Sequence, residues 1–459
     1  MWKRIVITLL IIAVLLFSRV QAAAAGNNQM IGINVLLKTG ITDIILTDLG
    51  THGTVRDVVY EIRAVTLQAR ASELSVIKAL PYVAAANPDA ERKDVPMVAS
   101  GITDFSGGIN TWNLDAINVT DFGSSNRQVA YDGTGVYVAV LDTGLVDNWR
   151  YYFPAERIAV EYAKCFGGGG GENGNVSEPT NKWEHDQNSH GTHVTSTILG
   201  YNMSGTSVNG VAPLATVIPV KVLNQNGSGW SSVVARGIVY VGDLKAGPLA
   251  GHPVVINMSL GGPSLDDMEK NAIDYAISKG VIIVAAAGNE GTAGMGYPGA
   301  YAPVISVAAS GWVGEWTAPA WWRMLNVPDP TNTADYYITD FSSRAKPGQD
   351  LDVAAPGSWI VGPYQTNGQL SYYYLGGTSM ASPHVAGIVA LMAQKNPALT
   401  AGVAETTLEA AAIALPPGCR TVNDGSGHMV NYCWGADATG AGLITADAAL
   451  TFVPKLKTK

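Results

Sequence analysis

Ser379 lies in the stretch GGTSMASPHVAG, where two glycines precede a pair of hydroxyl residues and an apolar segment follows. A serine at such a point can cap the first turn of a helix, or its hydroxyl can act as a nucleophile. His384 follows five residues later, and on a shared helix it would point about 140° away from Ser379. A nucleophilic Ser379 would therefore need a histidine and a carboxylate from elsewhere in the chain.

Three polar residues in distant segments could supply the remaining groups. Asp142 follows the apolar run VYVAVL, and His190 begins an apolar helical segment in HDQNSHGTHVTSTILG. Asn289 follows the run VIIVAAAG, and its amide can donate a hydrogen bond to a developing oxyanion. Taken singly, Asp142 and Asn289 also suit turns. Together with Ser379, the residues supply an acid, a base, a donor and a nucleophile.

The same region also permits a metal site. His185, Asp186, His190 and His193 are close in sequence, and two histidines three residues apart on a helix can share an ion. However, no glutamate has the spacing typical of zinc peptidases, and no cysteine is nearby. We therefore consider a metal-dependent hydrolase the weaker interpretation and expect His193 to be a packed, hydrogen-bonded residue behind His190.

The elements that must position these residues form an alternating pattern. Short, nearly continuous apolar runs (VYVAVL, VIPVKVL, PVVINMSL, VIIVAAAG and VISVAAS) are separated by helical segments such as DDMEKNAIDYAISKG. Runs that are apolar on both faces are typical of parallel strands buried between helices. We expect an α/β fold, with the site residues at the carboxyl ends of a mainly parallel sheet.

Composition restricts the possible partners. The chain has 459 residues, 47% of them hydrophobic and 14% charged, with a net charge of −9, which suits a large globular core and argues against nucleic-acid binding. Three cysteines are too few for a disulfide framework. We expect Cys419 and Cys433 to pair in an oxidising compartment and Cys165 to be an ordinary buried residue.

The N-terminus differs in character from the rest. Lys3 and Arg4 precede an apolar run from Ile5 to Phe17 and then small residues, which predicts a secretory signal peptide over 1–25. No later segment is apolar for the length of a membrane span, so we expect an exported protein without a membrane anchor. From about Asn34 to Ala90, strand-like runs and the segment SELSVIKAL, opening on a serine cap, predict a small α+β unit. The polar link DAERKDVPMVASGITDFSGG after it is expected to be an exposed boundary.

The four motifs AVLDTGL, HGTHV, AAAGNEG and GGTSMASPHVAG resemble the subtilisin family of serine peptidases. The resemblance extends from about Trp112 to Leu450 and includes GVAP, NMSLGG, GYPG and LDVAAPG. It implies a subtilisin-like three-layer fold over 101–459 and, more loosely, an inhibitory propeptide over 26–100. It also implies that Asp142, His190 and Ser379 are the catalytic triad, with the Asn289 side chain and the Ser379 N–H as the oxyanion donors.

Further roles are implied by the same resemblance. Substrate would bind as an added strand along Gly227, Ser228 and Gly229 and along Ser259, Leu260 and Gly261. Gly296 would floor the main specificity pocket, with Glu290 at its rim, and so would favour large apolar residues before the cut bond. A structural calcium ion is common in the family; GYNMSGTSVNG occupies the corresponding loop and Asn202 is a candidate ligand, but the loop lacks carboxylates and the ligands stay unassigned. No cofactor is implied for the chemistry.

The chain departs from the family in an insertion over about 311–337, which carries Trp312, Trp316, Trp321 and Trp322. We expect these tryptophans to form a small satellite core.

Three hypotheses remain for the function. The leading one is a secreted endopeptidase that acts on proteins and peptides and is made as a self-processing zymogen, inhibited by its own propeptide until a bond near residues 95 to 105 is cut. The alternatives are a catalytically silent binding module and the metal-dependent hydrolase.

Overall fold

The chain forms two compact units. The computed structural model describes residues 28–93, 97–100, 110–121, 126–167, 176–324, 326–328, 331–365 and 370–454. One unit comprises the described residues up to Asp89 together with Val176 and Asp266–Met268, and the other contains the rest of the chain from Ala90 onward. The predicted signal peptide lies outside the described residues.

The N-terminal unit is a four-stranded antiparallel sheet with two helices. The strand order is β2-β3-β1-β4, and apolar side chains of both layers, among them Ile33, Leu49 and Ile77, form its core. Helix α2 was not expected from the sequence, and Ser72 precedes α3 without making the predicted cap bond. The elements are β1 (Met30–Leu37), α2 (Asp43–His52), β2 (Thr54–Val59), β3 (Ala64–Arg70), α3 (Glu73–Lys78) and β4 (Val83–Pro88).

The second unit is built on an eight-stranded sheet in the order β16-β15-β14-β13-β7-β11-β8, with β17 paired to β15. Only β16 runs antiparallel to its neighbour among these pairings. All five apolar runs named in the sequence are strands here, because each is buried on both faces. The strands are β7 (Tyr137–Asp142), β8 (Lys164–Cys165), β11 (Thr216–Lys221), β13 (Val254–Met258), β14 (Val281–Ala286), β15 (Ile305–Trp312), β16 (Tyr336–Ile338) and β17 (Val353–Pro356).

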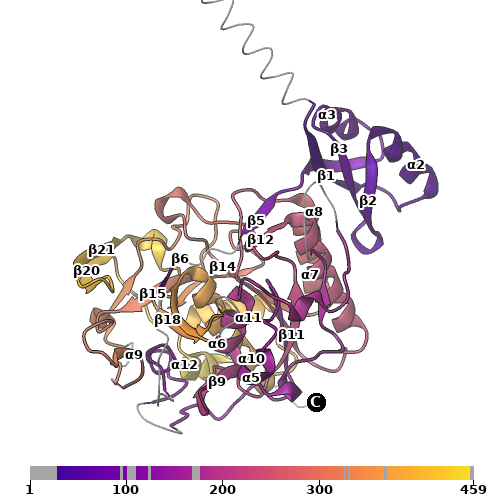
Figure 1. The fold of residues 1–459 in the computed structure, drawn as a ribbon. Coiled ribbons are helices and arrows are strands. Elements are labelled where there is room, and N and C mark those ends of the chain that lie inside the picture. Colours follow the sequence, from indigo (N-terminus) through magenta and orange to yellow (C-terminus); the bar gives the residue numbers. More distant parts are fainter. Residues whose placement is uncertain are drawn as a thin grey trace, which may run out of the picture. The chain divides into compact units, whose positions relative to one another are not determined.

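Helices cover both faces of this sheet (Figure 1). Side chains alternate along β7: Val138 and Val140 belong to the core cluster that contains the apolar residues of α10, whereas Leu141 packs near Gly237 of α7. The result is the predicted three-layer α/β arrangement. The principal helices are α6 (His190–Leu199), α7 (Ser231–Ala246), α8 (Asp267–Ser278), α10 (Thr378–Lys395), α11 (Ala401–Ala411) and α12 (Ala446–Phe452), with shorter helices α4 (Trp112–Asp115), α5 (Trp149–Tyr152) and α9 (Trp321–Met324).

The tryptophans of the insertion pack inside the protein, but they join the main core cluster and do not form the predicted satellite core. Trp312, Trp321 and Trp322 are buried, and Trp316 packs edge-on against Tyr374 with ring centroids 4.8 Å apart. Their burial in the main core explains why so many large apolar residues are tolerated in this stretch.

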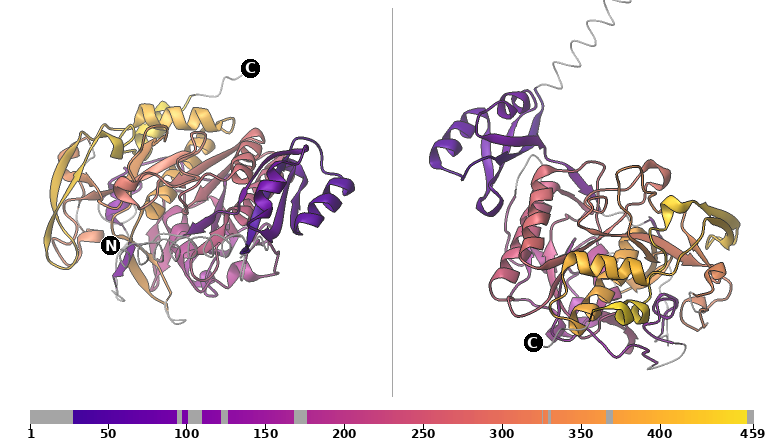
Figure 2. Two further views of the ribbon diagram at one scale, coloured as in Figure 1. Left: turned by 90° about the horizontal axis from the view of Figure 1, so that it is seen from above. Right: turned by 180° about the vertical axis from the view of Figure 1, so that it is seen from behind.

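The C-terminal hairpin lies beside β16 at the sheet edge (Figure 2). Its strands β20 (Gly418–Asn423) and β21 (Met429–Trp434) are joined by the Cys419–Cys433 disulfide, which confirms the predicted pair. Cys165 is a buried free thiol, also as predicted.

The segment after Asp89 joins the second unit through two short strands. Strand β5 (Glu91–Lys93) pairs antiparallel with β12 (Ser228–Trp230), and β6 (Met97–Ser100) pairs antiparallel with β19 (Tyr372–Gly376), which also pairs with β18 (Ile360–Pro363). The sequence predicted an exposed link here. In the structure Arg92 is buried, because backbone pairing draws β5 into the second unit.

Among the described helices, none combines the length and the apolar composition that a membrane span requires.

Candidate active site

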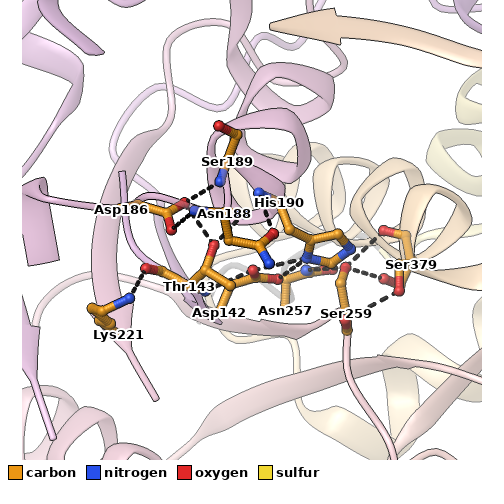
Figure 3. A network of polar contacts seen from close by, with 12 residues as sticks. Asp142, Thr143, Asp186, Asn188, Ser189, His190, Lys221, Asn257, Ser259 and Ser379 are labelled. Atoms are coloured by element: carbon orange, nitrogen blue, oxygen red, sulfur yellow. Dashed lines mark hydrogen bonds and ion pairs between the residues drawn. The ribbon is translucent and has the colours of Figure 1, made fainter. Parts of the chain in front are cut away.

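Asp142 and His190 form a buried acid–base pair. Asp142 is the last residue of β7 and His190 the first of α6, and both side chains are fully buried. The imidazole Nδ1 lies 2.8 and 3.0 Å from the two carboxylate oxygens of Asp142. In Figure 3 the imidazole ring lies between Asp142 and Ser379. A carboxylate that accepts from Nδ1–H leaves Nε2 as the basic nitrogen, so the pair can accept a proton on the side of Ser379.

A buried carboxylate shapes the turn that leads into His190. Asp186 accepts hydrogen bonds from the backbone N–H groups of Asn188 (2.9 Å) and Ser189 (2.8 Å) and from the Thr143 hydroxyl (2.7 Å). Ser189 has a φ of +81°, which is uncommon for a residue other than glycine and costs free energy. Burial raises the pKa of Asp186, although the nearby Lys221 charge opposes this rise. The network offsets the strain and sets the direction of the His190 side chain.

Thr143 and Gly191 bring β7 and α6 into close contact. The Thr143 hydroxyl accepts from the Gly191 N–H at 2.9 Å, so one side chain links Asp186 to the start of α6. A Cβ at Gly191 would lie 2.4 Å from the Gly144 carbonyl oxygen, which only glycine avoids. The glycine after His190 therefore allows the approach that pairs His190 with Asp142.

Ser379 is not a helix cap. It is the second residue of α10, whose cap position is occupied by Gly377 without a side-chain bond. The Ser379 hydroxyl donates to the Ser259 carbonyl at 3.1 Å. Helix α10 contains Pro383, which has no N–H to offer the Ser379 carbonyl; the Ser259 hydroxyl donates to that carbonyl instead, at 2.7 Å. The end of β13 and the start of α10 are thereby held together at Ser379.

Asn289 lies beside the start of α10. Its side-chain oxygen accepts from both the backbone N–H and the hydroxyl of Thr378, each at 2.9 Å, and the same hydroxyl accepts from the Gly288 N–H at 3.1 Å. These bonds fix the orientation of the Asn289 side chain, whose amide NH₂ is a hydrogen-bond donor. The geometry suits an amide that donates to a developing negative charge next to Ser379.

Two other histidines have structural roles, and for His193 this role was predicted from the sequence. His193 Nε2 donates to the Ile360 carbonyl at 3.1 Å, and burial lowers the pKa of His193 to about 3. His384 Nδ1 donates to the Met380 carbonyl at 2.8 Å, and burial lowers its pKa to about 4. Both imidazoles are neutral near pH 7 and are engaged inside the fold.

The arrangement around His190 does not favour a metal. His185 is exposed and contacts Asp147 at 2.9 Å, and Asp186 is committed to backbone and hydroxyl donors. Within the described part of the chain, the group of carboxylate, imidazole or thiol side chains close enough to share an ion is Asp350, Asp352 and Glu405, which includes none of these histidines. The zinc alternative gains no support.

The predicted substrate-binding residues flank an extended segment of the chain itself. Lys93 pairs with Ser228 on one side and with Gly261 on the other. Its N–H and carbonyl exchange hydrogen bonds of 3.1 Å with the carbonyl and N–H of Gly261. Gly227 and Gly229 border the first edge, and Ser259 and Leu260 lead into the second. The two predicted edges thus face each other across one strand, with β5 between them.

Gly296 and Glu290 lie near the second edge. A Cβ at Gly296 would lie 3.5 Å from the Gly262 carbonyl oxygen and 3.9 Å from the Gly261 Cα, so Gly296 faces that strand closely. The Glu290 carboxylate accepts from the Ser343 hydroxyl at 3.0 Å. Its position in the loop after β14 is therefore fixed, although its assignment to a pocket rim stays a prediction.

The predicted calcium loop is a hairpin between β9 (Gly200–Met203) and β10 (Thr206–Asn209). The Asn202 side chain accepts from the Gly205 N–H at 2.9 Å and donates to the Tyr151 carbonyl at 3.0 Å. These bonds give Asn202 a structural task in the turn, and no ligand set is assigned.

Several residues of the site were not assigned these supporting roles from the sequence. Thr378 was overlooked although it precedes Ser379 in the quoted motif. Asp186 was considered only as a metal ligand, and the Ser259 hydroxyl only as part of a substrate edge. Thr143 directly follows Asp142, and a polar side chain next to a strand-end carboxylate could have indicated its supporting role.

The chain is similar in sequence to known serine peptidases. Subtilisin from Bacillus sp. (strain TA39) is 34% identical over 290 residues, which is 61% of this chain and 60% of that protein. Thermitase from Thermoactinomyces vulgaris is 34% identical over 264 residues, 58% of this chain and 77% of that protein. The chain thus spans only about 60% of the length of the first of these relatives.

A solved structure and a family profile extend the comparison. Fervidolysin from Fervidobacterium pennivorans, described as a keratinolytic enzyme related to subtilisin, aligns with a TM-score of 0.66 and 25% identity over 93% of this chain and 61% of that one. The profile of the subtilase family, Peptidase_S8, matches residues 133–436. That range contains the strand-end carboxylate, the histidine and the serine described above, and the chain belongs to the subtilase family.

Proposed function

We propose that this protein is a serine endopeptidase that cuts peptide bonds through an acyl-enzyme on Ser379. The observation that carries the proposal is the buried Asp142–His190 pair, whose ring lies beside Ser379 (Figure 3). An activated serine needs a base within reach and a third group that orients the base. In the proposal His190 and Asp142 supply these groups, and it is supported by their position, with Ser379, inside the matched range 133–436.

Each residue has a defined task in the reaction. His190 accepts the Ser379 proton as the hydroxyl attacks the substrate carbonyl, and later returns it to the leaving amine. Asp142 holds the imidazole with Nδ1 protonated and stabilises its charged form. The Asn289 amide and the Ser379 N–H donate to the oxyanion, which the N-terminus of α10 also favours. Water then attacks the acyl-enzyme with His190 again acting as the base, which releases the product and restores the Ser379 hydroxyl.

Substrate binds as an extended strand in the position that β5 occupies. A strand there gains backbone hydrogen bonds on both sides, as Lys93 does with Gly261, and alternate side chains enter pockets. The absence of a side chain at Gly296 supports a pocket for a large apolar residue just before the cut bond. Proteins and peptides with accessible extended segments are the expected substrates.

The chain is made as a zymogen that processes itself. Lys93 pairs with Gly261, and Met97 pairs with Gly376, three residues before Ser379. These two pairings lie on either side of the nucleophile along the chain, and we place the first cut between residues 93 and 97. Residues 26 to the cut act as the inhibitory propeptide, because β5 occupies the cleft until it is released. The predicted signal peptide over residues 1–25 directs export of the precursor.

Labelling with a fluorophosphonate probe tests the activity. The secreted wild-type protein should be labelled at one serine, and Ser379→Ala should abolish the label because only an activated hydroxyl reacts. Ser278→Ala removes a serine hydroxyl at the end of α8 and serves as the control, with labelling retained. Absence of labelling in the wild type would favour the catalytically silent binding module. Activity lost in 1,10-phenanthroline would favour a metal enzyme.

A further inference from the structure

Arg92 is fully buried in the second unit, although arginine is among the residues least often found inside proteins. It belongs to β5, the strand that lies between the two predicted substrate edges. The second unit therefore contacts both the backbone of this segment and the Arg92 side chain.

The guanidinium of Arg92 meets a carboxylate and backbone carbonyls. Its Nε lies 3.2 Å from each carboxylate oxygen of Glu269, and its Nη2 also contacts Glu269. Nη2 donates to the Ser264 carbonyl at 3.2 Å, and Nη1 donates to the Glu91 carbonyl at 2.9 Å. Each of the three guanidinium nitrogens thus has an acceptor, in the planar fork geometry that suits arginine and not lysine.

Glu269 is an unusual residue for its position. It lies in the first turn of α8, and residues three, four and seven positions later, Ala272, Ile273 and Ala276, are all buried. That spacing is the apolar face of a helix, so Glu269 places a carboxylate where packing alone would favour an apolar side chain. Its own exposed fraction is 0%. Burying a carboxylate is costly unless a cation pairs with it.

The wall beside Arg92 has no side chain to obstruct the strand. A Cβ at Gly262 would lie 2.4 Å from the Glu91 carbonyl oxygen and 2.8 Å from Arg92 Nη1. A larger residue would therefore displace both the strand and the guanidinium. We call the space bounded by Glu269, Gly262 and the Ser264 carbonyl the arginine subsite.

We propose that the arginine subsite selects substrates, so that the mature enzyme prefers peptides with an arginine at the position that Arg92 occupies in the precursor. This inference rests on the proposed function and names a specificity-determining residue, Glu269. Processing removes the Arg92 guanidinium from the Glu269 carboxylate. A substrate arginine, brought to the same place by the same strand pairing, restores the charge-assisted bonds. Because the subsite is already formed, its binding requires no further rearrangement of the protein.

The proposed range for the first cut limits which substrate position corresponds to Arg92. The first cut lies after one of residues 93 to 96, so Arg92 corresponds to the second, third, fourth or fifth residue before the cut bond. Internally quenched peptides should carry arginine, lysine or citrulline at each of these positions in turn, with the remaining residues constant. Citrulline keeps the shape of arginine and lacks its charge.

At one of these positions, arginine should exceed citrulline in kcat/KM by about 10- to 100-fold, the range expected for hydrogen bonds between charged groups. Lysine should fall between them, because it offers a point charge without the fork. In Glu269→Gln the ratio of arginine to citrulline should approach one at that position. Asp274→Asn, which removes another carboxylate from α8, is the matched control and should keep the wild-type ratio.

A double variant separates a loss of arginine preference from a failure to fold. Removing one partner of a buried ion pair is destabilising, so Glu269→Gln could fail to fold with Arg92 in place. The double variant Arg92→Met with Glu269→Gln removes both charges and should be secreted, with the same loss of arginine preference. Equal rates for arginine and citrulline in the wild type, or a preference that persists without Glu269, would overturn the inference.

Wild type that is not labelled by fluorophosphonate and cuts none of the peptides would instead refute the proposed function. In that case, binding of the arginine and citrulline peptides, measured by fluorescence anisotropy, decides the inference separately: equal affinities reject the arginine subsite.

Discussion

Thr378 holds Asn289 through two hydrogen bonds of 2.9 Å, one from its N–H and one from its hydroxyl, to the same amide oxygen. The residue before the proposed nucleophile thereby orients the proposed oxyanion donor. This relationship joins the end of β14 to the start of α10, two elements that are remote in sequence. In the proposed mechanism an asparagine suits this position because its oxygen accepts from Thr378 while its NH₂ group is a donor.

Replacing Asn289 tests this assignment. Asn289→Leu should lower kcat by about 10² to 10³, the loss that removing an oxyanion donor causes in subtilisin, a member of the same family. KM should change little, because the oxyanion exists only near the transition state. Thr378→Val, which keeps Asn289 but removes one of its anchors, should cause a smaller loss in kcat. Steady-state kinetics on one peptide substrate measure both. An unchanged kcat in Asn289→Leu would reduce Asn289 to a turn residue.

Self-processing predicts a specific new N-terminus. Wild-type protein expressed in a host without other extracellular proteases should begin at one of residues 94 to 97, since Lys93 and Met97 bracket the nucleophile. Ser379→Ala should accumulate as a folded precursor, because alanine is small and favours helices. Intact-mass spectrometry and N-terminal sequencing distinguish the two forms. Trimming of Ser379→Ala to the wild-type N-terminus would show that maturation is not autocatalytic.

The pocket assignment of Gly296 predicts a graded change in specificity. A Cβ at Gly296 would make only ordinary contacts, the nearest at 3.5 Å, so Gly296→Ala should fold normally and reduce the preference for large residues slightly. Gly296→Leu should shift the preference before the cut bond from large apolar residues toward small ones. A peptide library with that position randomised measures the change. A strict requirement for lysine or arginine just before the cut in the wild type would contradict the assignment.

Glu315 predicts a dependence of stability on pH. It is buried in the tryptophan-rich insertion, where its carboxyl group accepts from the Trp312 N–H at 2.8 Å and the Ser358 hydroxyl at 2.7 Å. Burial raises its pKa from 4.5 to about 8. Between these values the folded protein holds a proton that the unfolded chain releases, so the free energy of unfolding falls as pH rises from 4.5 to about 8.

Glu315→Gln should remove this contribution, because glutamine mimics the protonated acid and can donate to the hydroxyl groups around it. Melting temperatures should be compared at pH values on either side of this range, in the Ser379→Ala background to prevent autolysis. The decrease in Tm with rising pH should be smaller in Glu315→Gln, by on the order of a few degrees. Glu156→Gln, at an exposed position, should keep the wild-type slope. The same slope in both variants would exclude Glu315 as the cause.

Much of the fold could be predicted because its signals are local. An apolar run of strand length, such as the one that ends at Asp142, must be buried on both faces, and strands of this kind pair in parallel between helices. Polar residues at the ends of such runs then gather at one edge of the sheet. Strand ends pointed to Asp142 and Asn289 as candidates, whereas their roles with His190 and Ser379 followed from the resemblance to the subtilisin family. The Cys419–Cys433 pair could be expected from its short spacing.

The rest depended on contacts between segments that no local pattern connects. The Ser259 hydroxyl bonds the Ser379 carbonyl because Pro383 has no N–H to offer, a compensation visible only when β13 and α10 are side by side. Arg92 appears in the sequence as part of a charged link, where solvation would be expected. Only the tertiary structure places the Glu269 carboxylate against it, and the low dielectric of that buried position strengthens the attraction between the two charges.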